Sequence, residues 1–253
     1  MKATKKNCLT KNQEKVMLKT YGNPETATQK EFEGEEIIVN ITIKGGQKYY
    51  DKEYVPRRVW HNTQNKPAFI IGNGKTREQF DLERLRNKGT TYGCNAVYRD
   101  FDPDYIVSLD RIISEEIAKE VDTQNKPCYS NKINIQRYSE HFILVPANPV
   151  MNCGATATHI AGFDGHKKIY LLGFDSYNID PKKVNNIYVD TNAYGKEHEV
   201  YEYGLWTNQM VKLFNHYNGI QFYRVGSKII DEYKNIANLK HITYGEFENE
   251  ITS

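Results

Sequence analysis

Two glycines and an asparagine, Gly72-Asn73-Gly74, follow a short apolar run and are residue types that can hold a phosphate. Glycines let a ligand approach the backbone, and a following helix offers free N–H groups and the positive end of its dipole. The stretch is not the dinucleotide-binding pattern GxGxxG, because Arg77 stands where the third glycine would be, and the phosphate loop GxxxxGK[ST] is absent. These residues therefore suit either a tight turn or a phosphate-binding turn.

Four later apolar runs, at 90–93, 105–109, 142–146 and 168–173, also lead into small or polar residues. Any one of these segments is typical of a turn, but together at one sheet edge they would surround a single ligand. Asp110 is a candidate for contact with a ribose or an acceptor, and Asp175 for the same contact or for capping the next turn. The candidate contacts after these four runs are Asn95, Asp110, Cys153, Gly154, Ala155 and Asp175.

The alternation of segments predicts the sheet that would bring these residues together. Helix-like segments, chiefly 111–121, 153–163 and 198–217, separate the apolar runs, and a further run lies at 220–225. Continuous apolar strands that alternate with helices indicate a parallel sheet covered on both faces. We therefore predict an α/β fold, a Rossmann-like, mostly parallel sheet with helices on both faces and a ligand site beyond the carboxyl ends of its strands. Helical spacing predicts that Trp206, Met210, Leu213 and Phe214 face the core.

Residues 1–62 have a different character and are predicted to form an N-terminal extension, whereas 63–253 form the Rossmann-like domain. The extension is polar and contains one strand pattern, at 36–43, which is followed by Gly45-Gly46. Within this pattern Val39, Ile41 and Ile43 alternate with polar residues, as in a half-buried strand.

Composition bounds the class of protein. The 253 residues include 34 Lys and Arg against 32 Asp and Glu, which gives no general electrostatic case for nucleic-acid binding. The four cysteines are widely spaced without a CxxC pair, which argues against a zinc site and a disulfide framework. No signal peptide follows the first lysines, and no apolar run approaches the length of a membrane span. We expect a soluble, cytoplasmic protein with reduced thiols, and the sequence leaves its oligomeric state open.

Three stretches together resemble the bacterial single-domain sialyltransferases and related uncharacterised nucleotide-binding proteins. They are IIGNG, YGCNAVYRDFDPDYIVSLD and NCGATATHIAGFDGHKKIYLLGFDSY, and the resemblance covers about residues 67 to 225. In that family a GNG turn, an asparagine after the second strand, a helix opened by Ser-Gly and a G-x-D-x-Y segment recur in this order. The resemblance implies a Rossmann-like enzyme that binds a cytidine monophosphate sugar. The same turn pattern occurs in proteins that resemble archaeal pterin pyrophosphokinases, so it indicates nucleotide binding more firmly than sugar transfer.

The resemblance assigns nucleotide contacts to residues of this chain. Asn73 would meet the phosphate or ribose, Asn95 would contact the nucleotide, and backbone N–H groups of Cys153, Gly154 and Ala155 would face the phosphate. Two departures stand out. Lys75 and Thr76 replace the family's Pro-Ser after GNG, and Lys75 suits either added positive charge at the phosphate or a solvated turn. The thiol of Cys153 replaces the family's serine hydroxyl and is a poorer hydrogen-bond donor.

The catalytic groups are expected in a lid at about 175–203, a long, polar segment rich in tyrosine. In the resembling family, tyrosines and a histidine of this region serve metal-free transfer. Tyr177, Tyr188 and Tyr194 are therefore candidate donors to the leaving phosphate, and His198 is the candidate general base. The Asp102-Pro103-Asp104 sequence precedes its strand and is read as a turn, so no metal is assigned.

The sequence favours a metal-independent glycosyltransferase without a cofactor, whose nucleotide-sugar donor is a substrate. Two alternatives stay open: a pyrophosphokinase-like nucleotide-phosphate enzyme, and a binding protein that kept the nucleotide pocket without the chemistry. Phosphoryl transfer normally needs Mg²⁺ held by carboxylates, for which Asp110 and Asp175 are the candidates. The acceptor is unidentified and could be a glycan, a small molecule or a modified DNA base.

Overall fold

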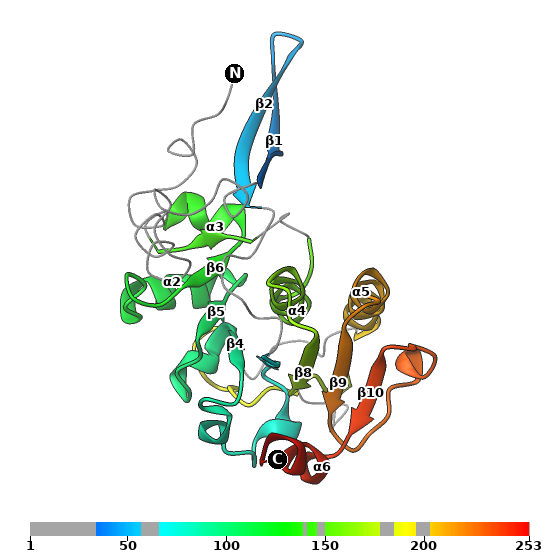
Figure 1. Cartoon of the computed structure of the whole chain (residues 1–253). Coiled ribbons are helices and arrows are strands. Elements are labelled where there is room, and N and C mark those ends of the chain that lie inside the picture. Colours follow the sequence, from blue (N-terminus) through cyan, green and yellow to red (C-terminus); the bar gives the residue numbers. More distant parts are fainter. Residues whose placement is uncertain are drawn as a thin grey trace, which may run out of the picture.

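Eight parallel strands form the sheet at the centre of the computed structural model, which describes residues 34–56, 66–138, 141–145, 150–177, 185–195 and 203–252. The strand order is β10-β9-β8-β3-β4-β5-β6-β7 (Figure 1). Every neighbouring pair in this sheet is parallel. The strands are β3 (Ala68–Ile71), β4 (Thr90–Cys94), β5 (Tyr105–Val107), β6 (Cys128–Ser130), β7 (Ile143–Leu144), β8 (Lys168–Leu172), β9 (Gln221–Val225) and β10 (Leu239–Ile242).

The chain reverses its direction of travel across the sheet between β3 and β8. From β3 it moves outward strand by strand to β7, and after helix α4 (Cys153–Phe163) it returns to β8 on the other side of β3. Such a reversal is a topological switch point, where the turns after the two central strands diverge and leave a crevice. The candidate site should therefore lie beyond the carboxyl ends of β3 and β8.

Helices cover both faces of the sheet. Alternate residues of each strand point to opposite sides, so each strand packs against helices on both faces. Ala68 and Ile70 pack in the cluster that contains α4 and α5 (Tyr203–His216), whereas Phe69 and Ile71 pack in the cluster that contains α6 (Tyr244–Thr252). A third cluster lies between β5, β6 and α2 (Arg111–Glu120). This architecture confirms the predicted α/β fold.

Two strands and two α-helices of the parallel-sheet region were not predicted from the sequence: β6, β10, α6 and α3 (Lys132–Arg137). β6 and α3 are short, which leaves too few residues for a periodic signal. Helix α6 begins with a capping box, in which the side chains of Thr243 and Glu246 each bond the other's backbone N–H. The Thr-x-x-Glu pattern of this box is visible in the sequence and could have located α6.

The N-terminal extension contains a hairpin rather than a single strand. The predicted strand at 36–43 is β1 (Gly34–Lys44), and it pairs antiparallel with β2 (Gln47–Pro56). Gly45 and Gly46 both have positive φ, 55° and 80°, as the tightest hairpin turns require. The hairpin projects from the domain in Figure 1. The predicted boundary at residues 62–63 lies outside the described residues.

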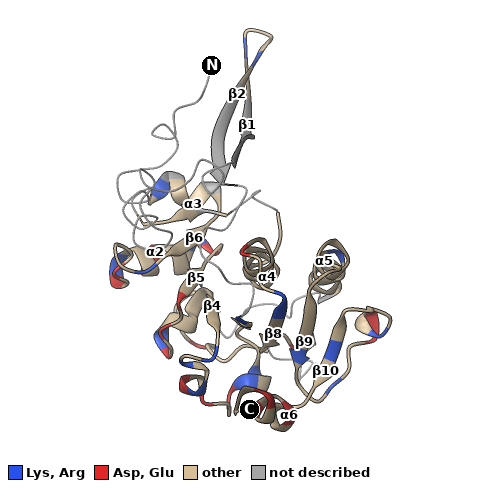
Figure 2. Ribbon diagram, viewed as in Figure 1, with Lys and Arg blue, Asp and Glu red and all other residues tan. Residues whose placement is uncertain are grey.

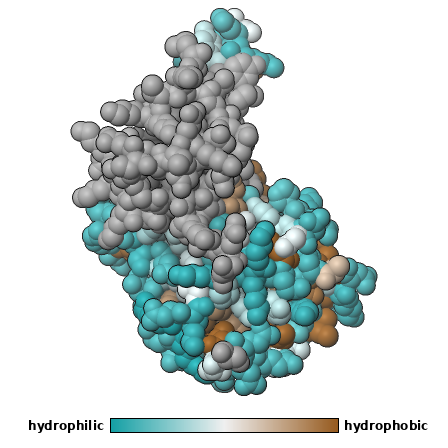
Figure 3. Space-filling model, in the orientation of Figure 1, coloured by the Kyte–Doolittle hydropathy of each residue, from teal (hydrophilic) through white to brown (hydrophobic). Residues whose placement is uncertain are grey.

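Charged residues of both signs are interspersed along the described elements (Figure 2), in keeping with the balanced composition. The described surface in Figure 3 is largely hydrophilic, with separate apolar areas. Within the described ranges, no helix is long and apolar enough to cross a membrane.

A buried polar network lies near the amino ends of the central strands. The hydroxyl of Tyr92 donates to Asp164 Oδ2 at 2.6 Å and lies 3.1 Å from His166 Nε2, while His166 Nδ1 lies 2.7 Å from the carbonyl oxygen of Lys66. Burial raises the pKa of Asp164 from 3.8 to about 7 and lowers the pKa of His166. Burial thus favours the uncharged forms of both groups.

Candidate functional site

A cavity of about 200 Å³ lies at the topological switch point. The turns after β3 and β8 form its floor, the end of β4 and the start of α2 form one side, and the first turn of α4 forms another. Helix α5 and the segment 185–195 complete it. Its lining residues are Gly72, Asn73, Gly74, Cys94, Asn95, Asp110, Asn152, Cys153, Gly154, Gly173, Phe174, Asp175, Ser176, Asn185, Asn186, Tyr194, Trp206 and Met210.

The turn after β8 passes so close to the turn after β3 that the latter needs glycine at positions 72 and 74. Gly72 N–H donates to the Leu172 carbonyl at 2.8 Å, and Gly74 N–H donates to the Gly173 carbonyl at 3.0 Å. A Cβ atom on Gly74 would lie 2.5 Å from the Gly173 oxygen, and one on Gly72 would lie 2.8 Å from it. Close approach of two backbones, rather than of a ligand, thus explains both glycines.

Asp175 joins the two turns through its buried carboxylate. Oδ2 accepts from the Thr76 backbone N–H at 3.2 Å and from Asn185 Nδ2 at 2.7 Å, and Oδ1 accepts from the Thr76 hydroxyl. The carboxylate is therefore engaged within the protein. Asp175 lines the cavity, and its contacts join it to Thr76 and Asn185 rather than to the turn that follows it, which was the predicted alternative.

A buried arginine fastens each of the two turns. Arg77 Nε donates to the Gly72 carbonyl at 2.6 Å, and Arg77 Nη2 donates to the Tyr188 hydroxyl at 2.7 Å. Arg224 is fully buried and donates to the carbonyls of Phe174 at 2.7 Å and Asp175 at 3.3 Å. Because charge-assisted hydrogen bonds are strong in a low-dielectric interior, these contacts should hold both turns rigidly.

Helix α4 directs its amino end to the cavity. The side chain of Asn152 caps the helix by accepting from the Ala155 N–H at 2.9 Å, so this N–H is already used. Ala155 is buried and does not line the cavity, which corrects the expectation that its N–H faces a phosphate. Cys153 and Gly154 line the cavity, but the Cys153 thiol donates to the Val107 carbonyl at 2.9 Å. The first helical turn therefore offers backbone groups and not the thiol.

Two carboxamide oxygens in the cavity wall are buried without a hydrogen-bond partner among the described residues: Oδ1 of Asn73 and Oδ1 of Asn95. Asn73 Nδ2 donates to the Tyr194 hydroxyl at 3.2 Å, which sets that hydroxyl beside the first turn. Buried polar atoms are nearly always paired in native proteins. Asn73 and Asn95 both line the cavity, so these two oxygens are candidate partners for a polar ligand.

The structure brings most of the predicted contact residues together and separates four from the cavity. One is Tyr188, whose hydroxyl accepts from Arg77 Nη2 at 2.7 Å. Lys75 does not line the cavity, and Ala155 is excluded by the helix cap. Tyr177 is also absent from the lining; its ring lies under Lys228, with Nζ 4.0 Å from the ring centroid. His198 lies outside the described residues. The predicted residues that do line the cavity are Gly72, Asn73, Gly74, Asn95, Asp110, Cys153, Gly154, Asp175 and Tyr194.

The lining includes residues that the sequence did not single out as contacts. Trp206 was predicted to face the core, but it is half-buried and forms part of the cavity wall, whereas Met210 belongs to both core and wall. Asn185 and Asn186 come from the predicted lid. Two adjacent carboxamide side chains are visible in the sequence there and could have marked these residues as ligand contacts. Asp102 and Asp104 do not line the cavity: Asp102 pairs with Lys126 at 2.6 Å, and Asp104 accepts from Thr91.

No family model matches the chain, and no curated protein matches it. Among solved structures it is similar to the sialyltransferase CstII from Campylobacter jejuni in complex with cytidine-5'-monophosphate, a substrate analogue. That match has a TM-score of 0.43 and 15% identity and covers 64% of this chain and 81% of that chain. A match to the complex of sialyltransferase CST-II with a trisaccharide acceptor and CMP has a TM-score of 0.40 and 15% identity and covers 74% and 99%.

The chain is also similar to the MAf glycosyltransferase from Magnetospirillum magneticum AMB-1, with a TM-score of 0.49 and 11% identity. This match covers 91% of the present chain and 38% of that chain. The reported structural neighbours are thus glycosyltransferases and include the family that the sequence resembles. Because every identity is below 25% and every TM-score below 0.5, donor, acceptor and mechanism have to be argued from the site of this chain.

Proposed function

We propose that the protein is a glycosyltransferase that moves a sugar from a nucleotide-sugar donor to an acceptor hydroxyl without a metal ion. The observation that carries the proposal is the cavity at the β3–β8 switch point, whose wall contains Asn73 and Asn95, two residues with buried carboxamide oxygens that have no partner among the described residues. Ribose hydroxyls and base amino groups are donors that would pair with such acceptors. The first turn of α4, with Cys153 and Gly154, would receive the phosphate on its backbone N–H groups.

In the proposed reaction, the acceptor oxygen forms a bond to the anomeric carbon of the sugar as the bond from that carbon to the phosphate oxygen breaks. The phosphate takes the electron pair, and the N–H groups of α4 together with the Tyr194 hydroxyl stabilise its added negative charge. The acceptor proton passes to a general base. His198 is proposed as that base on the sequence alone, because it stands where the predicted lid meets the next helix.

The binding step can be measured with a tryptophan of the cavity wall. The chain has only two tryptophans, Trp60 and Trp206, so a Trp60→Phe variant reports on Trp206 alone. We expect its fluorescence to change on titration with a nucleoside monophosphate or its sugar conjugate, from a panel that includes cytidine, uridine, adenosine and guanosine forms. If no member of the panel binds at millimolar concentration, the proposed function is wrong.

Substitutions in the Trp60→Phe background locate the binding. Asn95→Ala should weaken nucleotide binding by about 3- to 10-fold, the loss expected for one neutral hydrogen bond. Asn235→Ala is the matched control, because Asn235 is exposed and does not line the cavity. Equal affinity of the two variants would place the nucleotide elsewhere.

Transfer is then tested by release of the nucleotide from the bound sugar conjugate in the presence of candidate acceptors, with and without Mg²⁺. His198→Ala should lower single-turnover transfer by about 10²- to 10⁴-fold while leaving nucleotide affinity nearly unchanged. Transfer that needs Mg²⁺ and a nucleoside triphosphate would favour the pyrophosphokinase-like alternative. Binding without any transfer would favour the non-catalytic alternative.

A further inference from the structure

The segment 185–195 forms one wall of the cavity and is held from two sides. On the side of the sheet, the Ile187 N–H donates to the Asn73 carbonyl at 2.8 Å, and the Tyr188 hydroxyl meets Arg77. On the far side, the segment contacts two charged residues that do not line the cavity, Arg99 and Glu116. This second set of contacts has no role in the reaction proposed above.

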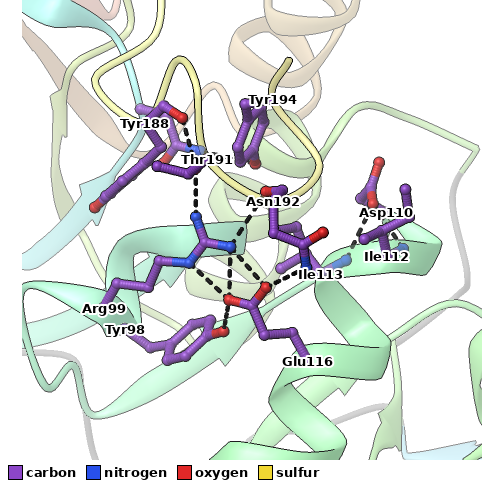
Figure 4. Close-up of polar contacts among 11 residues, drawn as sticks. Tyr98, Arg99, Asp110, Ile112, Ile113, Glu116, Tyr188, Thr191, Asn192 and Tyr194 are labelled. Atoms are coloured by element: carbon purple, nitrogen blue, oxygen red, sulfur yellow. Dashed lines mark hydrogen bonds and ion pairs between the residues drawn. The ribbon is translucent and has the colours of Figure 1, made fainter.

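Glu116 is the centre of the second set (Figure 4). It lies on α2 and is 8% exposed, and its carboxylate receives donors from three residues. Arg99 Nε donates to Oε1 at 2.6 Å, Arg99 Nη2 donates to Oε2 at 2.7 Å, and Asn192 Nδ2 donates to Oε2 at 2.6 Å. The hydroxyl of Tyr98 also donates to Oε1.

Arg99 extends this cluster onto the wall segment. Its Nη1 donates to the Thr191 hydroxyl at 2.7 Å, and its Nη2 donates to the Asn192 carbonyl at 3.2 Å. The planar guanidinium thus bridges a carboxylate on α2 and two successive residues of the segment, an arrangement that lysine cannot reproduce. In Figure 4 the bridge lies directly beside the turn that carries Tyr194.

The bridged segment is a tight turn with an unfavourable backbone. Asp190 and Ala193 have positive φ, 67° and 71°, a region that costs a non-glycine residue free energy. Within the turn, the Asp190 N–H donates to the Tyr194 carbonyl at 2.8 Å, and the Tyr194 N–H donates to the Thr191 carbonyl at 3.0 Å. Such a conformation persists only where surrounding contacts fix it, and Arg99 with Glu116 provides those contacts.

We propose that Glu116, acting through Arg99, is a positioning residue that holds the turn 188–194 so that the Tyr194 hydroxyl meets Asn73 at the cavity. The role of this contact in sugar transfer rests on the proposed function. Tyr194 touches the cavity, whereas Glu116 acts only through the turn. Loss of the Glu116 charge should therefore loosen the turn and lower the rate of transfer through Tyr194 alone.

A neighbouring residue on the same helix supplies a matched control. Glu115 pairs with Lys119 at 2.7 Å in an exposed i,i+4 ion pair and makes no contact with the wall segment. The apolar side chains that anchor α2, Ile113 and Ile117, are fully buried, and neither substitution changes them. Glu116→Gln and Glu115→Gln each remove one carboxylate from α2, but only the first removes the bridge to the turn.

Hydrogen exchange on the full-length protein without ligand tests the positioning. In Glu116→Gln, exchange of the backbone amides of residues 188–195 should rise by about tenfold or more, the change expected from losing one charge-assisted hydrogen bond. Exchange in β3 should not change. Arg99→Lys should behave like Glu116→Gln, and Glu115→Gln should behave like the wild type. Unchanged exchange at 188–195 in Glu116→Gln would overturn the proposal.

A double-mutant comparison tests whether the effect on the reaction passes through Tyr194. Glu116→Gln should lower kcat with a smaller effect on KM for the donor, and it should add no further loss in a Tyr194→Phe background. Full additivity of the two losses would overturn the route through Tyr194. The wild type could show slow hydrogen exchange at residues 188–195 that depends on Glu116, yet catalyse no sugar transfer. That result would overturn the proposed function and the role of Glu116 in the reaction, but the structural role of Glu116 in holding the turn would stand.

Discussion

Replacing Gly74 by alanine should destabilise the protein through steric collision with two fixed neighbours. Gly74 has φ −68° and ψ 145°, a conformation that alanine adopts freely, so backbone strain plays no part. The added Cβ would lie 2.5 Å from the Gly173 carbonyl oxygen and 2.6 Å from Asp175 Oδ2. Both neighbours are fixed, because Gly173 is backbone and the Asp175 carboxylate is held by Thr76 and Asn185.

The size of the effect follows from what must move. Overpacking by a methyl group typically costs about 1–3 kcal/mol. Separation of the two turns would also weaken the hydrogen bond from Gly74 N–H to the Gly173 carbonyl, which is worth about 0.5–1.5 kcal/mol. Opposing these terms, alanine restricts the unfolded chain and returns about 0.4–1 kcal/mol. The free energy of unfolding should therefore fall by about 1–3 kcal/mol.

Urea denaturation measures this change, and Gly219→Ala is the control. A Cβ at Gly219 would meet no atom within 4 Å, so that variant retains the unfolded-state effect without the collision. Gly74→Ala should unfold at lower urea than both wild type and Gly219→Ala, with an unchanged slope. Because the turn carries Asn73, nucleotide affinity should fall as well. If the two variants are equally stable, the interlock of the turns is not what requires glycine at position 74.

Three further outcomes are expected. Phe247→Ala should lower the free energy of unfolding by about 3–5 kcal/mol in urea denaturation, because Phe247 is fully buried against Phe69 and Tyr170. Arg224→Met should lower it by about 1–3 kcal/mol or more, since it leaves buried carbonyls unpaired. The pKa of Asp164 is raised from 3.8 to about 7, so its contribution to stability is complete below about pH 4 and is lost as the pH rises towards 7. Wild type should therefore lose stability relative to Asp164→Asn over that interval, and a pH-independent difference would refute the assignment.

The sequence contained enough information to predict the central strands of the sheet but not the edge strand β10. The central strands are continuous apolar runs, and the predicted helix at 153–163 coincides with α4 because its cap residue and its composition agree. The sequence of β10, LKHI, offers only two apolar residues, and its place in the sheet depends on pairing with β9. Such pairing is a tertiary effect that local propensity does not encode.

The convergence of strand ends was predictable, whereas the contacts that hold them were not. Parallel topology alone brings Asn73, Asn95 and Gly154 to one cavity. Which side chains form an ion pair or a hydrogen bond depends on distances between residues far apart in the chain, as with Glu116 and Asn192. For the same reason, the sequence could not show that the Asp175 carboxylate would be used by Thr76 and Asn185.

In the turn Gly72-Asn73-Gly74, the structure distinguishes residues required by packing from a residue suited to contact a ligand. Both glycines are explained by the crossing turn after β8, and a protein with no ligand would need them equally. Asn95 has φ 50°, a conformation that favours asparagine on its own account. Asn73 is not among the residues with positive φ, and its Oδ1 is buried without a partner in the described part of the chain. Neither backbone conformation nor packing between the turns accounts for that oxygen, so Asn73 is the residue of the turn that argues most directly for a bound ligand.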